Sequence, residues 1–279
     1  MIIYYGASNF TQNKELGRFG KPLSVLEPFE LIRKNGIKKK EWWDRYFLDS
    51  GAFSISQGGK PIDIQEYIDW LKIHEKEVDI YACFDVVGDG EASLFNWRRM
   101  KNEGLNPIPV FHDGEPFEIL EEYAKHTNYI GLGAVAYKST KARLLFFDRV
   151  FTMFPDNEKY KFHGFGVFGH DLLLRYPWES VDATSLSIWA RLGGIYYPGI
   201  GCMGINPQVH PDRLRWRKPL ADEIMRGYIE GLGLNYEIAQ GQDRAGILER
   251  ILVSLHYFES LREKVPKIFD PDFCSTPLF

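Results

Sequence analysis

Cysteine is scarce in this sequence. Its three cysteines, Cys83, Cys202 and Cys274, are an odd number and lie far apart along 279 residues. They form neither a disulfide framework nor the closely spaced pairs that hold a zinc ion. This usage is typical of a reducing compartment, and we expect a cytoplasmic protein without a metal site.

Long apolar runs are also missing. No stretch approaches the roughly 20 apolar residues of a transmembrane helix. The first residues, MIIYYGASNF, lack the basic start of a signal peptide. With 44% hydrophobic and 26% charged residues, the composition is that of a globular protein, and we expect no membrane partner.

Positive charge is not in excess, because 34 Lys and Arg face 38 Asp and Glu, for a net charge of −4. A nucleic-acid partner would therefore need a local basic patch. Two runs, 32–45 and 212–219, combine basic residues with tryptophan. Such runs are commonly solvated surface, but interleaved aromatic rings favour nucleic-acid binding. The candidate nucleic-acid-binding residues are Lys38, Lys39, Lys40, Arg213, Arg215 and Arg217.

Short β-rich runs alternate with stretches of helical periodicity, which is the pattern of parallel βα units. We predict strands at 2–5, 46–49, 80–84, 107–111, 129–132, 161–164, 179–182 and 194–197. We predict helices at 63–76, 90–103, 116–126, 141–153 and 169–175. Eight units in about 200 residues favour a closed (β/α)8 TIM barrel over an open doubly wound sheet. No GxGxxG follows the first strand, which argues against dinucleotide binding.

The sequence changes character after Pro198. A stretch rich in glycine and proline precedes two further helical stretches, at about 219–231 and 244–264. We therefore expect one α/β structural domain in two parts. The TIM-barrel core would span 1–210, and a C-terminal helical extension, 211–279, would pack on it.

Polar residues stand at the ends of the predicted strands, where barrel enzymes build their sites. They are Asp49, Asp85, His112, Asp113, His163 and Asp182. A strand-end aspartate can instead cap a helix, and a lone histidine can belong to the core. Gly131 and Gly133 either allow close packing or leave backbone N–H groups open to a flat ligand. Taken together, the residues predict an acidic site at one mouth of the barrel.

Four short segments resemble motifs of the tRNA-guanine transglycosylases, in order, over about 40–195. LDSGAFS at 48–54 resembles LDSGGFQ, and Asp85 falls where the family has its second base-binding aspartate. IGLGAV at 130–135 is similar to IGGLAV. DATSLSIWARLG at 182–193 matches DCVLPTRNARHG at Asp182, Ala190, Arg191 and Gly193.

The departures from this family point to a subgroup. The CxCxxC zinc site has no counterpart, His112 replaces the glutamine beside the base, and Ile188 replaces an arginine that reads the anticodon loop. HGFG at 163–166 and the segment 176–185 resemble the zinc-free DNA 7-deazaguanine transglycosylases of phages and bacteria. The resemblance therefore implies DNA as the polymer, in preference to tRNA, and the host cytoplasm if the protein is viral.

The resemblance also implies roles for individual residues. Asp182 would attack C1′ to form a glycosyl-enzyme, and Asp49 would act as acid and base. No cofactor is needed, and the partners would be DNA with free guanine and a 7-deazaguanine such as 7-cyano-7-deazaguanine. The substrate-binding residues would be Ser50, Phe53, Asp85, His112, Leu132, Gly133, His163 and Arg191.

Three other functions remain open from the sequence. One is a tRNA-guanine transglycosylase. Another is a TIM-barrel nucleoside or sugar hydrolase that uses the same carboxylates with water as acceptor. The last is a nucleic-acid-binding barrel without catalysis.

Overall fold

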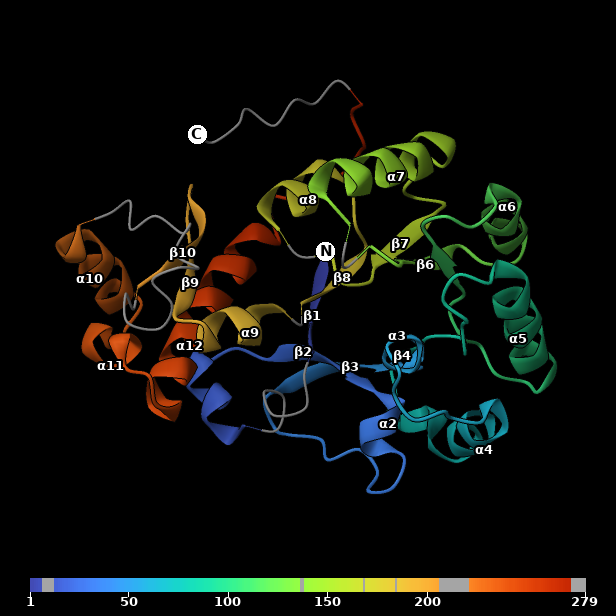
Figure 1. Cartoon of the computed structure of the whole chain (residues 1–279), viewed down its shortest axis with the longest axis horizontal. Coiled ribbons are helices and arrows are strands. Elements are labelled where there is room, and N and C mark those ends of the chain that lie inside the picture. The colour runs from blue at the N-terminus through green and yellow to red at the C-terminus, as the bar shows by residue number, and fades with distance from the viewer. Residues whose placement is uncertain (7–12, 136–137, 168, 184, 206–220, 272–279) are drawn as a thin grey trace.

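Eight parallel strands form a curled sheet at the centre of the protein (Figure 1). The computed structural model describes residues 1–6, 13–135, 138–167, 169–183, 185–205 and 221–271. The order of the strands is β4-β3-β2-β1-β8-β7-β6-β5. Their bounds are β1 Ile2–Gly6, β2 Leu23–Pro28, β3 Trp43–Asp49, β4 Ile80–Tyr81, β5 Val110–His112, β6 Tyr129–Gly133, β7 Lys161–Gly164 and β8 Ser180–Ala183. The predicted α/β class with a parallel sheet is confirmed.

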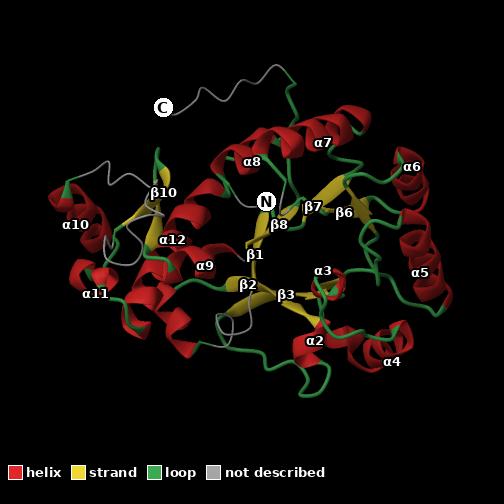
Figure 2. Cartoon of the chain, in the orientation of Figure 1, coloured by secondary structure: helices red, strands yellow, loops and turns green. Residues whose placement is uncertain are grey.

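Helices follow the strands and lie around the outside of the sheet (Figure 2). The longer ones begin at capping side chains: Asp63 accepts a hydrogen bond from Gln65 N, and Asp89 accepts one from Ala92 N. The bounds of the α-helices up to β8 are α2 Phe29–Ile32, α3 Ala52–Ser56, α4 Ile64–His74, α5 Gly90–Asn102, α6 Phe117–His126, α7 Thr140–Met153 and α8 His170–Arg175. Two 3₁₀ helices, η1 Lys14–Phe19 and η2 Glu75–Glu77, complete this part of the chain.

The sheet is not a continuous closed barrel, because β4 and β5 stand at its two ends. Past β4, an isolated parallel bridge joins Ala82 to Ile108, just before β5. Here Cys83 N donates to the Ile108 carbonyl at 2.8 Å, and Ile108 N donates to the Tyr81 carbonyl at 2.9 Å. The two ends of the sheet therefore meet at a short seam only.

Strand β2 is absent from the sequence prediction. Its sequence, LSVLEP, contains Ser24 and Glu27, which interrupt the apolar run. Both are buried, and the hydroxyl of Tyr46 on β3 donates to Glu27 Oε2 at 3.1 Å. Strands are predicted from runs of apolar residues. A buried carboxylate such as Glu27 breaks this run, although in the fold it has a hydrogen-bond partner on the next strand.

The prediction that 194–197 is a barrel strand is wrong. This segment is β9 (Gly194–Tyr197), and it pairs antiparallel with β10 (Gly201–Gly204) in a separate hairpin. Pro198 and Gly199 form its turn, in which Gly199 has a φ of +76° and Ile200 N donates to the Tyr197 carbonyl at 3.2 Å. Proline followed by glycine in the left-handed region is typical of a type II turn, so the PG dipeptide was the available signal.

The C-terminal part is helical, as predicted. It contains α10 Asp222–Gly231, α11 Tyr236–Gln240 and α12 Arg244–Leu261, preceded by α9 Ser185–Arg191. Helix α12 packs against α9, β9 and η1, and the hydroxyl of Tyr5 on β1 donates to Glu259 at 2.9 Å. The expected boundary at residue 210 lies outside the described residues. None of the described helices has the length and apolar character needed to cross a bilayer.

Candidate active site

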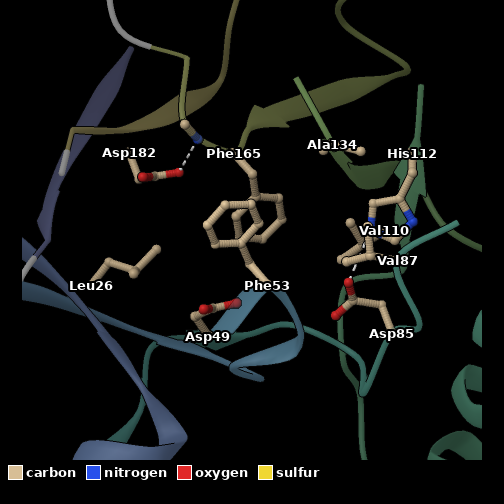
Figure 3. Close-up of a pocket in the computed structure, with 12 residues that line it drawn as sticks. Leu26, Asp49, Phe53, Asp85, Val87, Val110, His112, Ala134, Phe165 and Asp182 are labelled. Atoms are coloured by element: carbon tan, nitrogen blue, oxygen red, sulfur yellow. Dashed lines mark hydrogen bonds and ion pairs between the residues drawn. The ribbon is translucent and has the colours of Figure 1, made fainter. Parts of the chain in front are cut away.

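A cavity of about 170 Å³ opens among the carboxyl ends of the strands (Figure 3). In Figure 3, Asp49 and Asp182 lie on one side of it and Asp85 with His112 on the other, and the rings of Phe53 and Phe165 lie between them in this view. Because the strands are parallel, their carboxyl ends meet at one edge, which brings distant residues together. The lining residues are Leu26, Asp49, Phe53, Asp85, Val87, Val110, His112, Gly133, Ala134, Phe165, Gly166 and Asp182.

Asp49 is the last residue of β3, and the surroundings of its carboxyl group raise its pKa. The chain turns immediately after it at Gly51, which has a φ of +84°. Burial, followed by the charges of Asp85 and Asp182, raises the pKa of Asp49 to about 7. Hydrogen bonds with the backbone N–H groups of Ser50 and Gly51 oppose this rise. Such a group exchanges protons readily near neutral pH.

Asp182, on β8, faces the same cavity and is buried. Its Oδ1 accepts a hydrogen bond of 2.6 Å from Gly166 N, in the turn after β7. Gly166 has a φ of +62°, a left-handed conformation that glycine adopts without steric cost. The Nε2 atom of His163, on β7, lies 3.7 Å from the same oxygen.

Asp85 follows β4 and belongs to a buried chain of polar groups. Ser50 Oγ donates to Asp85 Oδ1 at 2.7 Å, and His112 Nε2 lies 3.0 Å from Asp85 Oδ2. On its other side, His112 Nδ1 lies 2.7 Å from Glu115 Oε1, and His112 N donates to Glu115 Oε2 at 2.9 Å. Glu115 is not among the residues predicted from the sequence, although its spacing of three residues from His112 in HDGE was a usable signal.

His112 is a charged link in this chain. Burial lowers the pKa of its ring, but hydrogen bonds and charges from Asp85 and Glu115 outweigh burial and raise the pKa to about 9. Both ring nitrogens then carry protons, and both donate to these carboxylates. His112 therefore lines the cavity and holds Asp85 in place, and it has no ring N–H left for a ligand.

Strand β6 makes room for the aromatic wall of the cavity. A Cβ added at Gly131 would lie 2.5 Å from the ring of Phe165, and one at Gly133 would lie 3.0 Å from the ring of His112. Close packing thus requires both glycines, and Gly133 also lines the cavity. Ala134 follows with a φ of +62°, a conformation that costs a non-glycine residue roughly 1 kcal/mol or more.

Four predicted substrate-binding residues lie outside the cavity lining: Ser50, which donates to Asp85, and Leu132, His163 and Arg191. The side chain of Leu132 is fully buried, and its carbonyl accepts a hydrogen bond from Phe165 N at 2.9 Å. Arg191 is exposed at the end of α9. His163 is fully buried behind Asp182.

The predicted basic run lies at the other end of the sheet. Lys38, Lys39 and Lys40 come three to five residues before β3 begins at Trp43, whereas the cavity is at the end of that strand. Seven residues of strand span about 20 Å. Trp43 is buried and stacks on Tyr46, with ring centroids 5.5 Å apart. This tryptophan therefore belongs to the core. Arg213, Arg215 and Arg217 lie outside the described residues.

Among the described residues, no three His, Cys, Asp or Glu side chains are arranged to hold a metal ion. The described cysteines, Cys83 and Cys202, are both free thiols. The polar side chains that line the cavity are the carboxyl groups of Asp49, Asp85 and Asp182 and the imidazole of His112, a set suited to proton transfer and to binding the polar edge of a planar ring.

The sequence matches no protein-family model and no curated protein. Function is therefore inferred from the geometry of this cavity together with the motifs that form it.

Proposed function

We propose that this protein is a nucleic-acid guanine transglycosylase, which exchanges guanine in DNA for a 7-deazaguanine base through a covalent glycosyl-aspartate. The observation that carries the proposal is the pair Asp49 and Asp182 in one cavity, with burial and nearby charge raising the pKa of Asp49 to about 7. The curled sheet of eight parallel strands supports the proposal because it brings the carboxyl ends of the strands around this cavity.

The two carboxyl groups divide the chemistry. Asp182 attacks C1′ of the nucleotide, the bond from C1′ to the purine breaks, and the proton of Asp49 passes to the departing guanine. The incoming 7-deazaguanine then returns a proton to Asp49, its nitrogen attacks C1′, and Asp182 leaves as a carboxylate. Two displacements at one carbon give net retention of configuration.

The opposite side of the cavity suits a guanine-like edge. Asp85 accepts a hydrogen bond from Ser50 and lies against His112, and each of its oxygens keeps a lone pair to accept from the ring N1–H and the exocyclic amine. The cavity is slightly larger than the roughly 150 Å³ that holds one benzene in an engineered core. Phe53 is 42% exposed and stands at the mouth, where it can stack on the base.

The choice of DNA depends on sequence resemblance at 163–166 and 176–185, together with the lack of the zinc motif. The target guanine must leave its stacked strand to enter so small a cavity, so base flipping is part of the proposal. The lysines at 38–40 do not flank the cavity and are not needed by it.

Incorporation of radiolabelled guanine into DNA or tRNA tests the proposal. The purified protein is incubated with the label and each polymer, and we expect acid-insoluble label in DNA. Label in tRNA alone would reassign the polymer. Release of free base without incorporation would identify a hydrolase. If the protein neither incorporates label nor releases free base, it is a non-catalytic barrel.

Matched variants localise the activity. Asp182→Asn and Asp49→Asn should each abolish incorporation. Asp113→Asn is the control, because Asp113 also stands at a strand end but pairs with Lys138 at 2.5 Å outside the cavity lining. Normal exchange by Asp182→Asn would contradict the assigned nucleophile. Denatured wild-type enzyme trapped during turnover should carry a nucleotide at Asp182.

A further inference from the structure

The imidazole of His163 lies beside the proposed nucleophile, Asp182, among aromatic rings. It is fully buried, and ring centroids of Phe165 and Phe47 lie 4.4 and 4.7 Å from its own. Its Nε2 atom has no hydrogen-bond partner among the described residues, and Asp182 Oδ1 lies 3.7 Å away. A buried nitrogen without a partner is costly, so this atom calls for an explanation.

The other ring nitrogen is firmly held. His163 Nδ1 lies 2.6 Å from Ser180 Oγ, and Ser180 Oγ lies 2.6 Å from the hydroxyl of Tyr129. Two proton arrangements are possible along this chain. If Tyr129 donates to Ser180 and Ser180 donates to Nδ1, the ring proton is on Nε2 and faces Asp182. The reverse arrangement would point a nitrogen lone pair at a buried carboxylate, which is repulsive.

The carboxylate of Asp182 is held from one side. Its Oδ1 accepts from Gly166 N at 2.6 Å and faces His163 Nε2. A carboxylate restrained through one oxygen presents the other for attack. The distance of 3.7 Å must shorten by roughly 0.5–1 Å to become a hydrogen bond.

We propose that His163 is a positioning residue for the nucleophile, and this rests on the proposed function. In its Nε2–H tautomer, fixed by Ser180 and Tyr129, it donates to Asp182 Oδ1. Together with Gly166 N–H, it aims Oδ2 at C1′. When the incoming base displaces the ester, Asp182 becomes a carboxylate again. The same Nε2–H group of His163 then stabilises the negative charge on Oδ1.

A neutral ring suits this role. Burial lowers the pKa of His163, against the opposing effect of Asp182. A neutral donor orients the carboxylate and leaves its charge in place, whereas an imidazolium would form an ion pair and make Asp182 a weaker nucleophile. The two buried histidines of the site therefore differ: His112 is charged and bonded to two carboxylates, and His163 is neutral and faces one.

The test uses two variants of nearly equal shape, His163→Gln and His163→Met. Both lose the aromatic contacts, but only glutamine keeps an N–H donor near the place of Nε2. We expect His163→Met to lower kcat by about 10- to 100-fold with KM for guanine within about twofold, and His163→Gln to stay within about 5-fold of wild type in kcat. Equal losses in both variants, or a wild-type kcat in His163→Met, would overturn the proposal.

A second measurement does not depend on turnover. Nitrogen NMR of the resting protein, with the His163 signal assigned by its loss in His163→Gln, reports the tautomer directly. We expect the Nε2–H form in wild type and a mixture of tautomers in Tyr129→Phe. An Nδ1–H form in wild type would refute the positioning role. Wild-type protein that incorporates no label while showing the Nε2–H form would refute the proposed reaction alone.

Discussion

The Nε2 atom of His112 lies 3.0 Å from Asp85 Oδ2, deep in the cavity wall. With Glu115 on the other ring nitrogen, this contact fixes a positive charge between two negative ones. The cavity thus keeps a net negative charge at its recognition side without two adjacent bare carboxylates, which would repel each other.

Because of this contact, the free energy of unfolding should fall as the pH becomes alkaline. The pKa of His112 is raised to about 9 in the folded protein, against about 6.5 in an unfolded chain. Its stabilising effect is therefore complete below pH 6.5 and is lost as the pH rises toward 9, by up to about 3 kcal/mol. Urea unfolding at several pH values should show this decline in wild type. His112→Gln should lack it, and Glu115→Gln should shift it to lower pH. A wild-type decline retained in His112→Gln would contradict the assignment.

The perturbed carboxyl of Asp49 predicts the same direction of pH dependence, a loss of stability as the pH rises, in a lower pH range. Its pKa is about 7 when folded and about 3.9 when unfolded, so charging it costs stability as the pH rises from 4 to 7. Asp49→Asn should therefore match wild type near pH 4 and become more stable than it by up to about 4 kcal/mol above pH 7. Asp113→Asn, outside the cavity, is the control. An equal gain at both pH values would show that the carboxyl is not perturbed.

Gly131 predicts a steric effect on the aromatic wall. Its added Cβ would lie 2.5 Å from the Phe165 ring, so Gly131→Ala must displace that ring, at a cost of about 1–3 kcal/mol. Guanine binding, followed by fluorescence or calorimetry, should weaken as well. Gly227→Ala is the matched control, because nothing lies within 4 Å of the added carbon in α10. That control should gain about 0.5–1 kcal/mol of helix stability. Unchanged stability in Gly131→Ala would show that the ring moves freely.

Phe53 predicts a loss of affinity with little loss of stability. It is 42% exposed at the mouth of the cavity, and stacking on a base is worth about 1–3 kcal/mol. Phe53→Ala should therefore weaken guanine binding by about 10-fold or more, while its melting temperature changes little. Phe95→Ala, 67% exposed on α5, is the control and should bind normally. Equal affinities in the two variants would remove Phe53 from the binding site.

The sequence was informative where local patterns carry the signal. Alternating runs identified seven of the strands in the sheet, and residues at strand ends, such as Asp49 and Asp182, lie together because parallel strands share an edge. Strand β2 was not predicted because it contains the charged residue Glu27. The buried carboxyl group of Glu27 accepts a hydrogen bond from Tyr46, and this contact forms only in the folded protein. The segment 194–197 was misplaced because a strand pattern does not reveal its partner.

The chemical roles of the site residues were harder to predict from the sequence than their positions at the ends of the strands. His112 and His163 both follow the strand pattern, yet one is bonded to two carboxylates and the other stands behind a third. Their different charges come from neighbours far away in sequence, and no local motif records them. The distance of Lys38, Lys39 and Lys40 from the cavity could not be read locally for a related reason, because strand direction decides which end of the sheet a loop occupies.

The contact between Tyr5 and Glu259 joins residues 254 positions apart. During synthesis, every strand of the sheet leaves the ribosome before α12 is made. The contact between β1 and α12 therefore cannot form until this last long helix has been synthesised. Closure of this fold is therefore a late event that follows translation of residue 261, and long-range closure of this kind is slow. Until then, the nascent chain presents apolar surface of the kind that chaperones cover.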